Sequence, residues 1–204
     1  MDPRSHWERQ YTTKGSAEFS WYQAEPARAL ALLRDAGAGP ASAVIDVGGG
    51  DSTLVDCVLR AGLGRVTVLD ISSAALARAK SRLGARARQV EWIEADITRA
   101  PLARGSFDVW HDRATFHFLL SPEERARYVE SCASALRAGG TLIVATFAPD
   151  GPPRCSGLDV ARYDADALAH EFGDRFTLQS SSTDTHHTPA GATQRFTVAA
   201  LRRR

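Results

Sequence analysis

The sequence alternates between short apolar runs rich in β-branched residues and longer segments whose apolar residues recur at helical spacing. The expected strands span residues 42–47, 65–71, 89–95, 107–111 and 141–147, and the expected helices span 52–62, 72–84 and 121–140. Parallel strands need long crossover connections, and these are usually helices. The alternation therefore predicts an α/β fold with a doubly wound, mostly parallel sheet.

The helix expected over 121–140 has the clearest boundaries. Ser121 is a typical N-cap, and it is followed by a first-turn proline and two glutamates. The pair Gly139 and Gly140 predicts the end of this helix.

After residue 148 the pattern changes to a stretch rich in glycine and proline. A short helical segment, 165–173, follows, and then come two strand-like runs, 175–185 and 192–202, which the turn "PAGA" connects. Two strands with a short connection favour an antiparallel C-terminal hairpin at the edge of the sheet. With no linker or repeat in sight, we expect residues 1–204 to form one domain.

Composition excludes several classes of protein. The 204 residues carry a formal net charge of +1, and their only basic run is the C-terminal "RRR", so we expect no nucleic-acid partner. There is no long apolar run, and the N-terminus lacks the layout of a secretory signal, which predicts a cytoplasmic protein without a membrane partner. Cys57, Cys132 and Cys155 form no CxxC pair, so neither a disulfide framework nor a metal site is expected.

The stretch "VIDVGGGDSTL" places three glycines after the first expected strand. Gly48, Gly49 and Gly50 let the backbone approach a ligand closely, and the start of the next helix offers an anion site. A dinucleotide-binding loop would have its third glycine at Thr53. Asp70, at the end of the next strand, is placed to accept hydrogen bonds from both hydroxyls of a ribose. A ribose-bearing ligand without a pyrophosphate fits best.

Four motifs at successive strand ends resemble those of the class I, seven-stranded S-adenosylmethionine-dependent methyltransferases, over about residues 7–201. "IDVGGGDS" is similar to the family's first motif, although Ser52 replaces its usual last glycine; Asp70 matches the ribose acid, "EADI" the adenine-binding segment, and "FDVWHDRATFHFL" the fourth strand and its exit. The resemblance implies a Rossmann-like fold and S-adenosylmethionine as cofactor, with S-adenosylhomocysteine as product. The implied cofactor-binding residues are Asp46, Gly48, Gly49, Gly50, Asp70, Ile71, Asp96, Ile97 and His111.

The sequence says less about the methyl acceptor. A sulfonium methyl is already activated, so the protein has to align a nucleophile, exclude water and, where needed, remove a proton. Asp112, which we expect to face the cleft, and His117 are the candidate catalytic residues, although Asp112 could instead stabilise a loop and His117 could be packed in its aromatic run. Residues 1–24 are expected to form a lid or substrate segment. The candidate acceptor contacts are Trp21, Tyr22, Arg113, Cys155 and Tyr163.

A closer resemblance bears on the acceptor. "HWERQY", "FSWYQ" and "DRATFH" are similar to segments of the lysine methyltransferases that modify elongation factor 1A and citrate synthase. Arg113 and Ala114 stand where that group has Lys and Gly, and His117 replaces an acid that would attract a lysine ammonium. We therefore expect a small-molecule acceptor, with protein lysine as the alternative. A non-catalytic cofactor-binding protein and a reductase that uses a nicotinamide dinucleotide are further alternatives.

Overall fold

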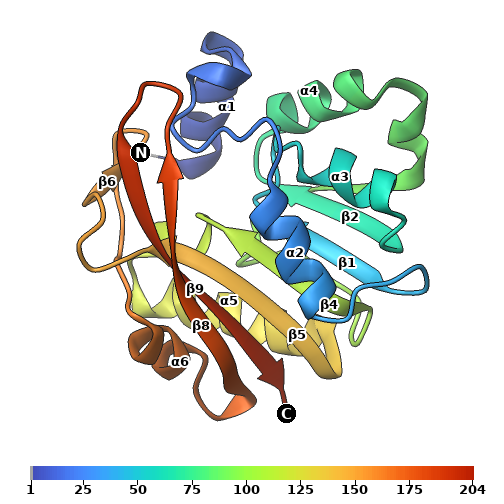
Figure 1. Ribbon diagram of the computed structural model, residues 1–204, viewed down its shortest axis with the longest axis vertical. Helices are drawn as coiled ribbons and strands as arrows, with labels where there is room; N and C mark the ends of the chain where they lie inside the picture. The colour runs from blue at the N-terminus through green and yellow to red at the C-terminus, as the bar shows by residue number, and fades with distance from the viewer. Residues whose placement is uncertain (1) are drawn as a thin grey trace.

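A seven-stranded sheet with the strand order β3-β2-β1-β4-β5-β9-β8 forms the centre of the computed structural model, which describes residues 2–204 (Figure 1). The strands are β1 (Ala43–Val47), β2 (Arg65–Asp70), β3 (Val90–Glu94), β4 (Phe107–Arg113), β5 (Leu136–Phe147), β8 (Phe176–His187) and β9 (Thr193–Arg203). Strands β1 to β5 are parallel, and β9 lies antiparallel between β5 and the outermost strand β8. The predicted α/β sheet and its C-terminal hairpin are confirmed.

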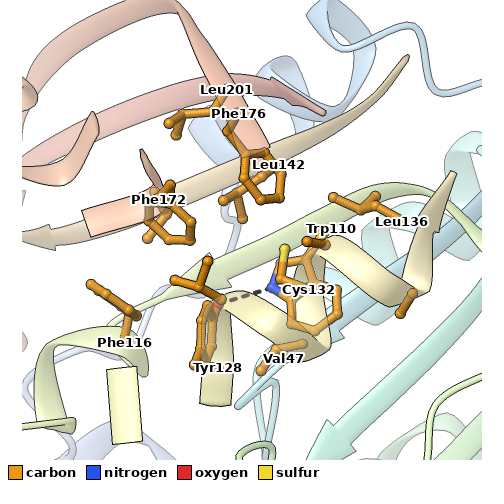
Figure 2. Packing of buried hydrophobic residues seen from close by; sticks show 14 of the residues in the cluster. Val47, Trp110, Phe116, Tyr128, Cys132, Leu136, Leu142, Phe172, Phe176 and Leu201 are labelled. Atoms are coloured by element: carbon orange, nitrogen blue, oxygen red, sulfur yellow. Dashed lines mark hydrogen bonds between the residues drawn. The ribbon is translucent and has the colours of Figure 1, made fainter. Parts of the chain in front are cut away.

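Helices cover both faces of the sheet. The helices α2 (Ala27–Asp35), α3 (Leu54–Ala61) and α4 (Ser73–Leu83) share one apolar core with the sheet, and α5 (Pro122–Ala135) and α6 (Ala165–Phe172) share the other. Figure 2 shows the second core, where Trp110 of β4 donates a 2.9 Å hydrogen bond to the Tyr128 hydroxyl of α5. Because successive side chains of a strand point to opposite faces of the sheet, neighbouring residues of one strand enter different helix layers, one on the α2–α4 side and the next on the α5–α6 side.

The structure contains several short elements that the sequence did not predict. Helix α1 (Pro3–Thr13) contacts α4, and the short strands β6 (Arg154–Cys155) and β7 (Leu158–Asp159) pair with each other. Four 3-10 helices complete the structure: η1 (Ser16–Glu18), η2 (Gly84–Gln89), η3 (Phe116–Phe118) and η4 (Gly173–Arg175). Only His6 and Tyr11 of α1 are buried, so its sequence carries little of the apolar spacing that predicts a helix.

The helix predicted over 121–140 begins as expected but ends early. Ser121 accepts a hydrogen bond from the Glu124 amide at 3.2 Å, which confirms the N-cap. The helix ends at Ala135, and Leu136 already pairs with Phe107 of β4. The expected end at Gly139 and Gly140 is therefore wrong, because the chain enters β5 directly and these glycines lie within the strand, where the β4–β5 register shifts. Within residues 2–204, no helix combines the length and the hydropathy needed to cross a bilayer.

Candidate functional site

The register of β1 against β4 places one acid and one histidine together. Asp46 lies opposite His111, and the Asp46 Oδ1 atom is 2.7 Å from His111 Nδ1. Both side chains are buried on the face that α2, α3 and α4 cover. Since successive strand residues point to opposite faces, Asp112 enters the α5 layer instead.

The glycine loop after β1 is packed tightly by side chains from elsewhere in the chain. Gly48 has a φ of +66° and Gly50 a φ of +45°, conformations that favour glycine. A Cβ atom at Gly48 would lie 1.8 Å from Thr115 Oγ1, and one at Gly50 would lie 2.7 Å from the Tyr11 hydroxyl. These glycines are therefore needed for close contacts within the protein as well as for any ligand.

A first cavity, of about 190 Å³, lies at the ends of β2 and β3. It is lined by Asp70 and Ile71 after β2 and by Asp96 and Ile97 after β3. The Asp70 carboxylate accepts a 2.8 Å hydrogen bond from the Ser72 amide, and burial raises the pKa of Asp70 to about 7. A buried carboxylate beside apolar side chains suits a ribose diol and a purine ring. Asp96 also stabilises its own turn, because it accepts a 2.9 Å hydrogen bond from the Thr98 amide.

A second cavity, of about 60 Å³, adjoins the first at the glycine loop. Its floor is formed by Asp46, Gly48, Gly49 and His111, whereas Gly50 lies just outside it. Four aromatic residues of the N-terminal segment cover it: Tyr11, Phe19, Trp21 and Tyr22. The Trp21 ring stacks on Phe19 with a centroid distance of 4.5 Å. Trp21 therefore both anchors this segment and lines the cavities.

A third cavity, of about 340 Å³, lies between α2 and strands β5, β9 and β8. Its apolar wall includes Ile143, Phe196 and Val198. It shares His111 and Arg113 with the second cavity, and Arg113 also lines the first. The three cavities thus meet at the end of β4.

The prediction that Asp112 faces the cleft is wrong. Asp112 is fully buried on the α5 side, where it accepts hydrogen bonds from the amides of Thr115 at 2.9 Å and Phe116 at 3.1 Å and from the Tyr128 hydroxyl at 2.6 Å. It lines none of the three cavities. Its position supports the alternative role of stabilising the loop after β4.

Two further predicted site residues lie outside the cavities. His117 is fully buried beside the rings of Phe118 and Phe147, and burial lowers the pKa of His117 to about 3. Tyr163 is buried with its ring 5.7 Å from that of Phe116, on the α5–α6 side. Their predicted roles as a base and as an acceptor contact are corrected to packing roles.

The other candidates for the acceptor site lie at the cavities. Cys155, although buried, lines the first cavity with Arg113, and Tyr22 lines the second. Neither Tyr11 nor Phe196 was predicted as a site residue from the sequence. The motif "HWERQY", which ends in Tyr11, could have indicated Tyr11, whereas no local signal marks Phe196, which reaches the site from β9.

Comparison with known proteins finds a matching domain family over part of the chain. Residues 44–140 match the model of a methyltransferase domain family. This match covers a little under half of the chain, and together with the seven-stranded fold and the acidic glycine loop it supports the resemblance to the class I S-adenosylmethionine-dependent methyltransferases.

Individual relatives are distant. The chain is 26% identical over 148 residues to the eEF1A lysine and N-terminal methyltransferase of Danio rerio. This match covers 71% of this chain and 21% of that protein. It is 32% identical over 107 residues to the ubiquinone/menaquinone biosynthesis C-methyltransferase of Roseobacter denitrificans, covering 51% of this chain and 42% of that protein. The chain thus spans less than half the length of these curated relatives.

A solved structure matches over nearly the whole chain. It is the Burkholderia thailandensis 1,6-didemethyltoxoflavin-N1-methyltransferase with bound 1,6-didemethyltoxoflavin and S-adenosylhomocysteine. The TM-score is 0.73 at 19% identity, and the match covers 98% of this chain and 86% of that one. At this identity the likeness supports the fold.

Proposed function

We propose that the protein transfers a methyl group from S-adenosylmethionine to a small-molecule acceptor. The observation that carries this proposal is the meeting of three cavities at Arg113, two of which also share His111. The first two would hold the cofactor, and the third, at about 340 Å³, falls within the usual size of a small-molecule site.

The cofactor would be bound along the ends of β1, β2 and β3. Asp70 would accept hydrogen bonds from the ribose, Asp96 and Ile97 would contact the adenine, and the glycine loop with Asp46 would hold the methionyl end. When bound, the cofactor supplies a methyl group that is already activated for attack by a nucleophile. The protein then has to position the acceptor and keep water out.

His111 is the best-placed group to receive a proton from the acceptor. The pairing with Asp46 favours the tautomer in which His111 Nδ1 carries the proton and donates it in a hydrogen bond to the Asp46 carboxylate. The unprotonated Nε2 atom is then free to accept a proton. The imidazole ring lines both the second and the third cavity. His111 thus takes the role that the sequence offered to Asp112 and His117.

Residues 1–24 would act as a lid over the cofactor. Ser16 donates a hydrogen bond to Asp51 beside the glycine loop, and the Glu8 carboxylate accepts hydrogen bonds from the hydroxyls of Ser72 at 2.7 Å and Ser73 at 2.9 Å. The Glu8 contacts hold α1 against the start of α4. Closure by this segment would exclude water from the transfer step.

The similarity to the Danio rerio enzyme favours a second candidate, a protein-lysine methyltransferase. Binding of the cofactor without turnover is a third. The cytoplasmic placement and the absence of a nucleic-acid partner stay predictions.

Transfer of a labelled methyl group from S-adenosylmethionine into size-fractionated extract of the source organism separates these candidates. Label in the small-molecule fraction, lost with the Asp70→Ala variant, supports the proposal. Label in a protein band instead supports the lysine candidate, and absence of enzyme-dependent label from every fraction argues against turnover.

A further inference from the structure

Arg113 is a largely buried cation at the point where the three cavities meet. One Nη atom donates a 3.2 Å hydrogen bond to the Trp21 carbonyl, and the guanidinium lies 4.6 Å from the centroid of the Phe196 ring. The other, Nη2, is buried and has no hydrogen-bond partner among residues 2–204. A buried polar donor of this kind normally has a partner.

The charge of Arg113 is not balanced by a neighbouring acid. Burial lowers the pKa of Arg113 to about 10, so the guanidinium stays charged at neutral pH. Asp184, whose charge acts on it, forms a 3.0 Å ion pair with Arg28 instead. Asp46 is paired with His111, and Asp112 faces the opposite layer. The site therefore offers a positive charge and a free donor toward its ligand.

We propose that Arg113 is the anion-binding residue of the acceptor site, so that the acceptor is a small organic molecule carrying a carboxylate or a comparable anionic group. This inference rests on the proposed function and names its substrate class. The third cavity suits such a molecule, because Ile143, Phe196 and Val198 would contact its apolar body while Arg113 binds its acid.

The same charge disfavours a lysine acceptor. A lysine ammonium entering this site would lie near both the guanidinium of Arg113 and the sulfonium of the cofactor, and like charges in a buried site repel strongly. An anionic acceptor would instead reduce the positive charge on both sides. Arg113 thus selects between the two acceptor classes that the comparisons suggest.

The test measures binding of small acids to the protein loaded with S-adenosylhomocysteine. The probes are benzoate, salicylate, indole-3-acetate and succinate, each compared with its primary amide by ligand-observed NMR and calorimetry. At least one acid is expected to bind about tenfold or more tightly than its amide, and Arg113→Gln should remove this preference. Arg113→Lys should retain part of it.

Arg195→Gln is the matched control, since Arg195 lies next to Phe196 on β9 but is paired with Asp150 at 2.6 Å and lines none of the three cavities. It should leave the preference for acids unchanged. The inference is overturned if no acid binds better than its amide, or if Arg113→Gln leaves the preference intact.

The binding data also distinguish a role of Arg113 in binding the acceptor from a role in binding the cofactor. If Arg113→Gln weakens S-adenosylhomocysteine tenfold while no acid is preferred, Arg113 serves the cofactor's own carboxylate and the inference fails. Failure of the wild-type protein to bind S-adenosylhomocysteine would instead contradict the proposed function itself. Labelled protein-lysine product that persists with Arg113→Gln would likewise overturn the anionic acceptor.

Discussion

The two halves of the site differ in charge and in how the chain builds them. The cofactor half presents the carboxylates of Asp46, Asp70 and Asp96 at the ends of three neighbouring parallel strands. The acceptor half presents Arg113 stacked on Phe196, which are 83 positions apart in the sequence (196 − 113). Under the proposed function, the cofactor shared by the whole class would be bound by local motifs, whereas the acceptor specific to this protein would be bound by segments that only the fold brings together.

The largest expected effect concerns an acid that belongs to neither half. Asp112→Ala removes the acceptor for the buried Phe116 amide, the half-buried Thr115 amide and the Tyr128 hydroxyl, so we expect a loss of about 3 kcal/mol in the free energy of unfolding, measured by urea denaturation. The folded fraction should still bind S-adenosylhomocysteine.

Asp112→Asn is the control for this variant, since an amide oxygen can still accept from the backbone, and it should lose less stability. If Asp112→Ala kept normal stability but lost cofactor binding, Asp112 would have to face the cleft. This result would contradict its assignment to the α5 layer by strand register.

The next effect follows from the protonation of Asp70. Burial raises the pKa of Asp70 from its usual 3.8 to about 7, so between these values the folded protein holds a proton that the unfolded chain has lost. Stability of the ligand-free protein should therefore fall as pH rises from about 4 to about 7. Asp70→Asn should recover on the order of 2 kcal/mol of unfolding free energy at pH 8 and little at pH 4, measured by denaturation at both pH values. If Asp70→Asn recovered the same unfolding free energy at pH 4 and at pH 8, the raised pKa of Asp70 would be ruled out.

The Asp70 carboxylate, which destabilises the ligand-free protein at high pH, should strengthen the binding of S-adenosylhomocysteine. Asp70→Ala removes hydrogen bonds to the ribose, and we expect S-adenosylhomocysteine to bind about 10- to 100-fold more weakly by calorimetry. Glu94→Ala is the matched control, because Glu94 lies beside Asp70 in the register of β2 and β3 but outside the three cavities. Equal losses for both variants would show a general charge effect.

The sequence predicts the cofactor half well, for a physical reason. Each of its residues follows a strand that the apolar pattern already indicates, and parallel strands bring their carboxyl ends to one edge of the sheet. Asp70 and Asp96 could therefore be placed together before the structure was known, as the first cavity now has them.

The acceptor half depends on details that local patterns do not fix. Asp112 and His111 are adjacent, and a shift of one residue in register exchanges the faces that they occupy. The expected strand ended at His111, so the sequence alone could not assign the layer of Asp112. Phe196 reaches Arg113 only because β9 inserts between β5 and β8.

The smallest expected effect tests the aromatic cover where the two halves meet. Trp21 lines the first and second cavities, and its ring also packs against Trp7 with a centroid distance of 5.8 Å. Trp21→Ala removes the ring but keeps the backbone carbonyl that accepts from Arg113, so the change reports on the ring alone. We expect the binding free energy of S-adenosylhomocysteine to fall by about 1 kcal/mol. The ligand should then bind about fivefold more weakly and dissociate faster in stopped-flow experiments. Trp92→Ala, on β3 outside the cavities, should leave both the affinity and the dissociation rate unchanged. If Trp21→Ala instead unfolded the N-terminal segment without changing cofactor dissociation, the aromatic cluster would serve only to anchor that segment, and the cofactor half would need no lid.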